Sequence, residues 1–137
     1  MTQPQDFWER AIKAISSAKL TIEVDFDGAA SRAYYAAFYA VSALFAMEDK
    51  TFKRHSNVES AVHNDLVRTG RWPVDLGKAY SFLRETRTTG DYGGDLHVSE
   101  DDALKAIHLV SLKLFYVAKN LTVPKNMCKS GAVAIYT

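Results

Sequence analysis

Cysteine is almost absent from the sequence, which has Cys128 and no second cysteine. A single cysteine cannot form a disulfide within the chain, and this favours a reducing compartment such as the cytoplasm. No apolar run approaches the roughly 20 residues that a membrane-spanning helix needs. The first ten residues, MTQPQDFWER, are too polar for a signal peptide. We therefore expect a cytoplasmic protein that makes no contact with a membrane.

An excess of charge of one sign is also lacking, because 17 basic residues oppose 16 acidic ones and the formal net charge is +1. This balance argues against strong nonspecific binding of nucleic acid by the monomer, but it is compatible with a local basic cleft. No glycine-rich loop joins a strand to a helix, so no phosphate cradle is predicted. The serines lack nucleophile-elbow sequences, and the four histidines lack metal-ligand spacing. The sequence thus predicts neither a triad hydrolase, nor a metal site, nor a bound cofactor.

The sequence does have hydrophobic periodicity of the helical kind. Its 137 residues suffice for one domain with its own core. Helices are predicted over residues 5–19, 25–47, 56–69, 75–89 and 99–121. Their short connections favour an all-α fold, an antiparallel up-and-down four-helix bundle with an additional short helix. We expect residues 1–121 to form this bundle and residues 122–137 to form a tail that is either irregular or docked on a partner.

Several residues are predicted to begin or end these helices. His55, or one of the two residues after it, is the expected cap of the third helix, and Gly70 is its expected stop. Asp75 is the candidate cap of the fourth helix, which Gly90 is expected to end or distort. Ser99 precedes an acidic first turn and is the expected start of the fifth helix.

The strongest candidate for a functional element lies near the end of the fourth helix. The apolar stripe of this helix passes through Leu83 and reaches Arg87 four residues later. A buried arginine needs a partner or water, because an unpaired buried charge is very costly. Asp91 is predicted to supply that partner as an i,i+4 pair. The pair either staples the helix end or holds Arg87 in a cleft, where its planar fork can bind two phosphate oxygens.

The second helix has two contrasting faces. The face that contains Tyr34 is predicted to lie in the core. The opposite face mixes Arg32 with Tyr35 and Tyr39, separated by small residues. These two tyrosines are either core residues with satisfied hydroxyl groups, or part of a polar groove beside Arg87, or part of a surface for helix packing in a dimer.

The histidines offer one candidate for proton transfer. His97 lies nearest to Arg87 in the sequence, ten residues after it, and is that candidate. His55 precedes the third helix and is expected to act as its cap. His63 and His108 fall on polar flanks, where we expect them to be solvated.

Three segments together resemble the HEPN domain family. They are SRAYYAAFYAVSALF at 31–45, HSNV at 55–58 and LRETRTTGDYGG at 83–94. The Ser-Arg-x-Tyr-Tyr-Ala-x-Phe helix and the Arg-x-x-x-Asp-Tyr element are similar to those of the family's small stand-alone prokaryotic branch. The resemblance covers residues 7–121 and is specific because the motifs occur together and in order.

The resemblance implies an up-and-down helical bundle that usually dimerises, with a cleft between protomers at the end of the fourth helix. Many members are metal-independent endoribonucleases, and some are toxins neutralised by a minimal nucleotidyltransferase encoded beside them. Others bind nucleotides, RNA or proteins without catalysis. In the active nucleases four to six residues separate the arginine from a histidine, whereas this chain has Tyr92, Gly93 and Gly94 at the corresponding positions.

Residues and resemblance together predict a HEPN protein, an RNA-acting toxin-type component that forms a homodimer and is a candidate metal-independent endoribonuclease. The alternative is a noncatalytic module that binds a nucleotide, RNA or a protein and pairs with a minimal nucleotidyltransferase antitoxin. The catalytic candidates are Arg87, Asp91, Tyr92 and His97, and the binding candidates are Arg32, Tyr35, Tyr39, Arg84 and His55.

Overall fold

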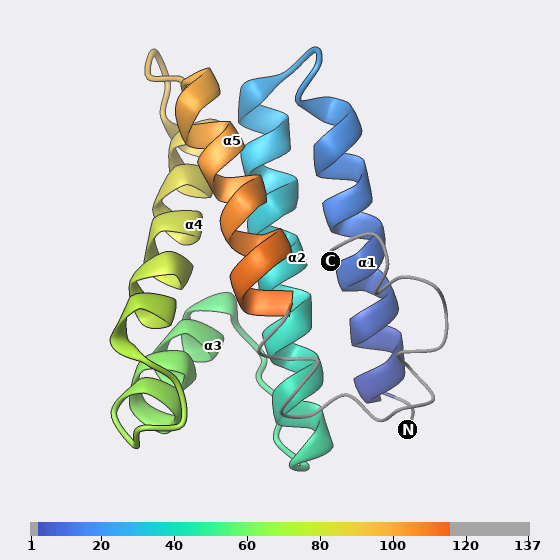
Figure 1. Ribbon diagram of the computed structural model, residues 1–137, viewed down its shortest axis with the longest axis vertical. Coiled ribbons are helices and arrows are strands. Elements are labelled where there is room, and N and C mark those ends of the chain that lie inside the picture. Colours follow the sequence, from blue (N-terminus) through green and yellow to red (C-terminus); the bar gives the residue numbers. More distant parts are fainter. Residues whose placement is uncertain (1–2, 116–137) are drawn as a thin grey trace.

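The computed structural model describes residues 3–115, which form helices and their connecting loops without a strand (Figure 1). Wider, π-type turns continue two of the helices without a break. The elements are α1 (Gln3–Thr21), α2 (Phe26–Met47), α3 (His55–Ala61) continued by η1 (Val62–Val67), α4 (Val74–Tyr92), and α5 (Glu100–Leu109) continued by η2 (Val110–Leu114). The predicted all-α class is therefore confirmed.

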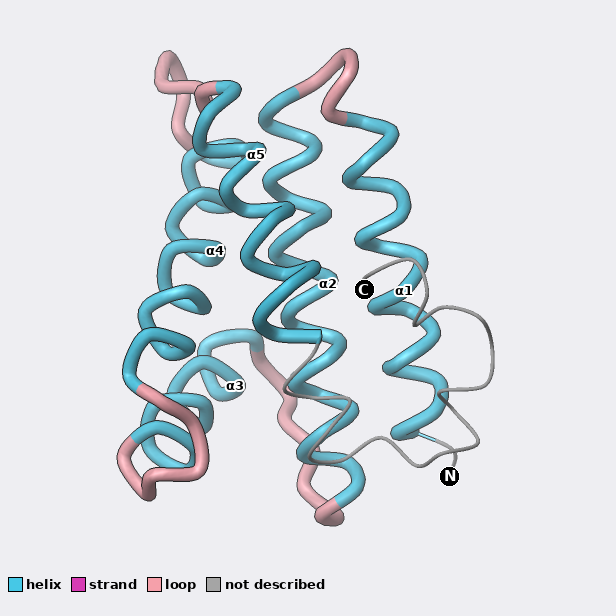
Figure 2. The backbone as a smooth tube through the Cα atoms, in the orientation of Figure 1, coloured by secondary structure: helices cyan, strands magenta, loops and turns pink. Residues whose placement is uncertain are grey.

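The four longer helices run alternately up and down, with α1 rising, α2 descending, α4 rising and α5 descending (Figure 2). The short α3–η1 segment lies at one end of the bundle, between α2 and α4. This is the predicted up-and-down bundle with an additional short helix. The last turns predicted for the fifth helix, the boundary at residue 121 and the tail 122–137 lie outside the described residues.

α2 is the central helix, and it packs against α1, α4 and α5. Its contact faces are rich in small side chains, which let neighbouring helices approach closely. The alanines of α2 that are at most 2% exposed are Ala29, Ala30, Ala33, Ala36, Ala37, Ala40 and Ala43. Tyr34 is 1% exposed, so its predicted place in the core is confirmed.

Two predicted helix starts and one predicted helix stop are right, and two predicted starts are wrong. Asp25 caps α2 by accepting a hydrogen bond from the Gly28 amide at 2.9 Å, and Ser99 caps α5 by accepting one from the Asp102 amide at 3.1 Å. Gly70 follows η1 with φ of 83°, a left-handed conformation that suits glycine.

The caps predicted for the third and fourth helices are wrong. Arg54 precedes α3 and makes no side-chain capping bond, so His55 is the first residue of the helix and not its cap. Pro73 precedes α4, and Asp75 lies inside the first turn. Proline can occupy this position because its fixed φ suits a helix start and no amide hydrogen is needed there.

Gly90 does not end α4, which continues to Tyr92. A Cβ atom at position 90 would lie 2.9 Å from the backbone oxygen of Asp27, at the start of α2. The glycine is therefore needed for a close approach of two helices and not for a stop. This approach places Asp91 against α2, where Ser31 Oγ donates a hydrogen bond to Asp91 Oδ2 at 3.3 Å.

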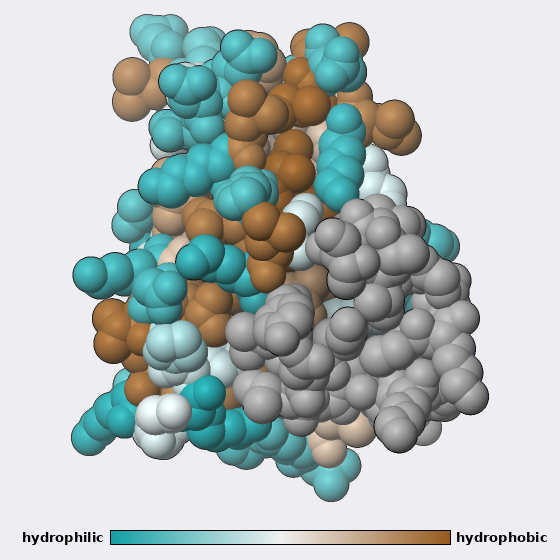
Figure 3. Space-filling view, viewed as in Figure 1, coloured by the Kyte–Doolittle hydropathy of each residue, from teal (hydrophilic) through white to brown (hydrophobic). Residues whose placement is uncertain are grey.

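The surface seen from the α5 side is mixed in character. Apolar side chains gather in the middle of this face, where α2 is visible between α1 and α5, and hydrophilic side chains flank them (Figure 3). Between residues 3 and 115, no helix has both the length and the apolar character that crossing a bilayer requires.

Candidate functional site

Arg87 lies in the last turns of α4, with its side chain only 17% exposed. Its Nε lies 2.9 Å from Asp91 Oδ2, so the predicted i,i+4 pair is present. The Nε–H is not aimed well enough at that oxygen to form a hydrogen bond, and the contact is therefore an ion pair. The Nη2 atom donates a hydrogen bond to the Tyr35 hydroxyl, on α2, at 2.9 Å.

Aromatic rings surround the Arg87 guanidinium. Its central carbon lies 5.6 Å from the ring centre of Tyr34, 5.3 Å from that of Tyr35 and 5.2 Å from that of Tyr92. Such rings attract a cation through their negative faces. Burial acts to lower the pKa of Arg87, but Tyr35, Asp91 and the other tyrosines outweigh it and raise the pKa above its usual range. The guanidinium is thus held charged in a partly dry site.

His55 lies beside these rings, although it is far from Arg87 in the sequence. Its ring centre is 4.3 Å from that of Phe38, 5.4 Å from that of Tyr35 and 6.0 Å from that of Tyr34. Burial, and next the positive charge of Arg87, lower the pKa of His55 below its ordinary 6.5. The imidazole is therefore neutral at neutral pH and able to accept a proton. We call Arg87, Asp91, Ser31, Tyr34, Tyr35, Tyr92, Phe38 and His55 the Arg87 cluster.

The pKa of His55 provides a test of this arrangement. In an NMR titration we expect His55 to titrate below 6.5, and Arg87→Gln to move its pKa upward because a nearby positive charge is removed. The contribution of His55 to stability should be complete above pH 6.5 and be lost as the pH falls, since the folded state disfavours the charged form. Arg71→Gln is the control, because Arg71 pairs with Glu48. An unchanged His55 titration in Arg87→Gln would contradict the placement.

Two of the predicted binding arginines have other partners. Arg32 is exposed, and its Nη1 donates a hydrogen bond to the Gly28 backbone oxygen at 3.2 Å. Arg84 Nε donates one to Glu59 Oε1 on α3 at 3.0 Å. Arg84 thus ties α4 to α3. Tyr39 does reach the cluster, because its ring centre lies 6.1 Å from that of Tyr35.

His97 lies on the loop between α4 and α5 and is tied to the start of α2. Its Nδ1 is 2.7 Å from Asp27 Oδ2, and the Val98 amide donates a hydrogen bond to Asp27 Oδ1 at 2.7 Å. The bond from Val98, and then that from His97, lower the pKa of Asp27. His97 therefore anchors its loop to Asp27 rather than contacting Arg87. Asp27 precedes Ser31 by one helical turn of α2.

Asp27→Asn tests this anchor. We expect a loss of about 1 kcal/mol in the free energy of unfolding at neutral pH, because charge-assisted hydrogen bonds are lost from a side chain that is 25% exposed. The depressed pKa means that the stabilisation is complete above the unfolded value near 4 and is lost as the pH falls through the folded value. The variant should therefore show a shallower acid destabilisation in urea titrations. Asp95→Asn, at an exposed position of the same loop, should behave as wild type.

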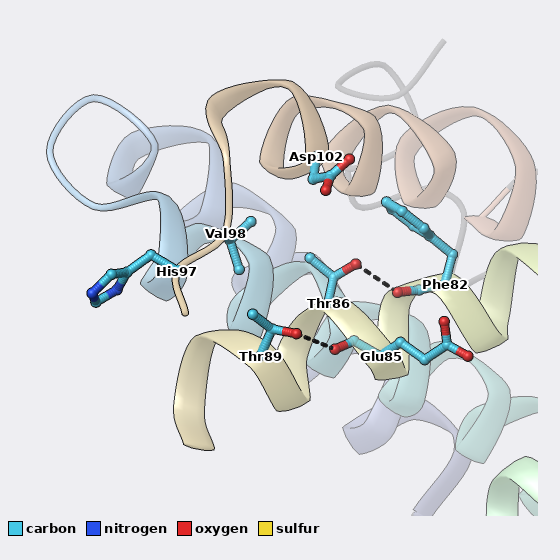
Figure 4. A pocket seen from close by; sticks show the side chains of 7 residues that line it. All are labelled: Phe82, Glu85, Thr86, Thr89, His97, Val98 and Asp102. Atoms are coloured by element: carbon cyan, nitrogen blue, oxygen red, sulfur yellow. Dashed lines mark hydrogen bonds between the residues drawn. The ribbon is translucent and has the colours of Figure 1, made fainter. Parts of the chain in front are cut away.

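A surface cavity of about 210 Å³ lies between α4 and the start of α5 (Figure 4). The Thr86 hydroxyl donates to the Phe82 backbone oxygen at 2.7 Å, and the Thr89 hydroxyl to that of Glu85 at 3.2 Å. The His97 ring points away from the other lining residues. The remaining polar groups include two carboxylates, so this cavity is poorly suited to an anion. In the part of the chain that the structure describes, no group of three or more His, Cys, Asp or Glu side chains could hold a metal ion.

The structure thus brings together five of the nine candidates, Arg87, Asp91, Tyr92, Tyr35 and His55, with Tyr39 at their edge. Sequence reasoning missed three contributors, Ser31, Tyr34 and Phe38. Ser31 precedes Tyr35 by one helical turn, and this spacing could have placed both on the face toward Arg87. No sequence signal indicated that the buried ring of Tyr34 also faces the guanidinium.

Comparisons with known proteins match this chain to one family model and to two named relatives. Residues 4–120 match the family model described as HEPN domain, and this span contains the whole Arg87 cluster. A protein of Thermotoga maritima named "UPF0332 protein" is 37% identical over 99 residues, which cover 71% of this chain and 75% of that protein. A protein of Methanocaldococcus jannaschii named "Putative toxin MJ0142" is 27% identical over 124 residues, which cover 86% of this chain and 84% of that protein.

Proposed function

This chain belongs to the HEPN domain family, and from that premise we propose that it is an RNA-acting, toxin-type component of a toxin–antitoxin or defence system. The observation that carries the proposal is the charged Arg87 guanidinium, held by Asp91 and Tyr35 and only partly exposed. A fixed cation of this kind suits a phosphodiester, whose negative charge grows during cleavage. The toxin name of the relative from M. jannaschii supports the same reading.

The proposed reaction is cleavage of RNA by its own 2′-hydroxyl group. The 2′ oxygen attacks the adjacent phosphorus, the bond from phosphorus to the 5′ oxygen breaks, and a 2′,3′-cyclic phosphate forms. His55, neutral beside Arg87, accepts the proton of the 2′-hydroxyl, and the departing 5′ oxygen takes a proton from water. Arg87 stabilises the charge on the phosphate oxygens, and the exposed Tyr92 hydroxyl donates a hydrogen bond to the phosphate.

In this proposal His55 takes the proton-transfer role that the sequence favoured for His97. His55 lies among the rings that surround Arg87, whereas His97 is engaged by Asp27. A homodimer is proposed as the working form, in which two Arg87 clusters meet and double the local positive charge. A minimal nucleotidyltransferase is the proposed neutralising partner.

The test uses the purified chain and an unstructured RNA in the presence of a chelator. We expect cleavage products with 2′,3′-cyclic phosphate ends, and growth arrest when the chain is expressed without a partner. RNA that stays intact under these conditions would sink the nuclease proposal.

A second candidate function is a noncatalytic module that binds a nucleotide, RNA or a protein through the same cluster and pairs with a nucleotidyltransferase. It is favoured by the sequence after Arg87, where Tyr92, Gly93 and Gly94 stand in place of a histidine. Saturable binding of RNA with no cleavage, and with no effect of His55→Ala on growth, is the result that distinguishes this module from a nuclease.

A further inference from the structure

A row of aromatic rings continues from the Arg87 cluster along α2 and onto α1. Tyr39 lies one helical turn after Tyr35, and their ring centres are 6.1 Å apart. Phe7 of α1 stacks beyond Tyr39, at 6.4 Å between centres and 24° between planes. All three rings are only partly buried, so each keeps part of its surface in solvent. We call Tyr35, Tyr39 and Phe7 the aromatic row.

Arginines lie over two of the three rings of the aromatic row. Arg87 lies over Tyr35 at 5.3 Å, and the central carbon of the Arg10 guanidinium lies 5.9 Å from the ring centre of Tyr39. Arg10 is exposed and forms a surface pair with Asp6, at 3.3 Å between Nε and Oδ2. A surface ion pair of this kind contributes little to stability, so Arg10 can exchange its partner at low cost.

We infer that the aromatic row binds the single-stranded RNA that flanks the phosphate at Arg87, with unpaired bases stacking on Tyr39 and Phe7. This inference rests on the proposed function and adds its substrate class. Proteins bind single strands with two elements, aromatic rings and positive charges. The rings stack on the bases, because every base has a face that can stack, and the arginines contact the phosphates. Bases inside a duplex are stacked on one another and cannot use such a surface.

The charge of the chain strengthens the argument for stacking. A net charge of +1 supplies little general attraction for a polyanion. Base stacking must then provide much of the affinity. Among residues 3–115, the arginines that lie over the row are Arg10 and Arg87. We therefore expect a shallow salt dependence, with a slope of log K against log salt of about −1.4 for two phosphates at about 0.7 each.

The test measures fluorescence anisotropy with a 2′-O-methyl RNA strand, which cannot be cleaved, and with a strand of the same length that lacks its bases. The wild-type chain should bind the complete strand about tenfold more tightly than the strand without bases, and more tightly than a duplex. Tyr39→Leu should weaken binding of the complete strand about tenfold, because one stacked base contributes about 1–3 kcal/mol. Tyr39→Phe should bind within twofold of wild type, because stacking needs the ring and not the hydroxyl group.

Phe82→Leu is the matched control, since Phe82 is also partly buried and has a cation over its ring, Lys105 at 4.4 Å, but lies outside the row. Wild-type binding by a folded Tyr39→Leu, or equal binding of the strands with and without bases, would overturn the inference. A change from dimer to monomer in Tyr39→Leu, seen by sedimentation velocity, would also overturn it by showing that the row is an interface between copies. If the chain binds RNA through Tyr39 but does not cleave it, the nuclease proposal is refuted and the inference about the aromatic row stands.

Discussion

Arg87→Ala is expected to reduce RNA cleavage at least about 100-fold and to abolish growth arrest, while the helical fold persists. Removal of one preorganised group that stabilises transition-state charge typically costs a factor of this size. Arg87→Lys should fail nearly as badly, because a lysine lacks the planar fork that contacts Asp91 and Tyr35 together. The measurement is the initial cleavage rate of an unstructured RNA, with circular dichroism to verify folding.

Arg71→Ala serves as the control for this prediction. It removes a surface arginine that pairs with Glu48 at another part of the molecule, so cleavage should stay at the wild-type rate. Full activity in a folded Arg87→Ala chain would remove the basis of the proposed mechanism. Equal losses in both variants would instead indicate that cleavage depends on overall charge.

Trp72→Ala is expected to cost about 3–5 kcal/mol of unfolding free energy, a large share of the about 5–15 kcal/mol that typically stabilises a domain. Trp72 is 1% exposed and joins the core from the connection between η1 and α4, and its amide donates a hydrogen bond to the Leu66 backbone oxygen. Deleting the indole leaves a cavity in the core cluster to which Trp72 belongs. The urea midpoint measures the effect.

Trp72→Phe separates packing from hydrogen bonding at this position. The indole Nε1 of Trp72 has no hydrogen-bond partner among residues 3–115, so phenylalanine loses volume but no bond. Its cost should therefore be clearly smaller than that of alanine. Equal midpoints for wild type and Trp72→Ala would show that this side chain does not support the core.

The parts of the structure that were predictable from the sequence are those that depend on local geometry. Helical periodicity depends on the neighbours of each residue along one element, and it predicted the bundle correctly. The Arg87–Asp91 pair spans one turn, so its spacing alone was sufficient. The caps Asp25 and Ser99 are local in the same way.

The parts that were missed depend on how helices meet. His55 reaches Tyr35 only because the chain turns back after α2 and places the start of α3 beside that helix, and no spacing in the sequence encodes that contact. Gly90 was expected to end or distort α4, because a glycine that allows close packing looks the same in a sequence as one that ends a helix. His97 was chosen for its nearness in sequence to Arg87, whereas its partner is Asp27, 70 positions away.

The Arg87 cluster joins α2 to α4 across long stretches of chain, as in the Ser31–Asp91 bond between residues 60 positions apart. During synthesis, the guanidinium and its tyrosines cannot meet until α4 has emerged and docked. A nascent or partly unfolded chain therefore carries no assembled site, and the activity proposed for that site requires the folded bundle. A ligand that binds only the assembled cluster will in turn raise the melting temperature of the whole bundle.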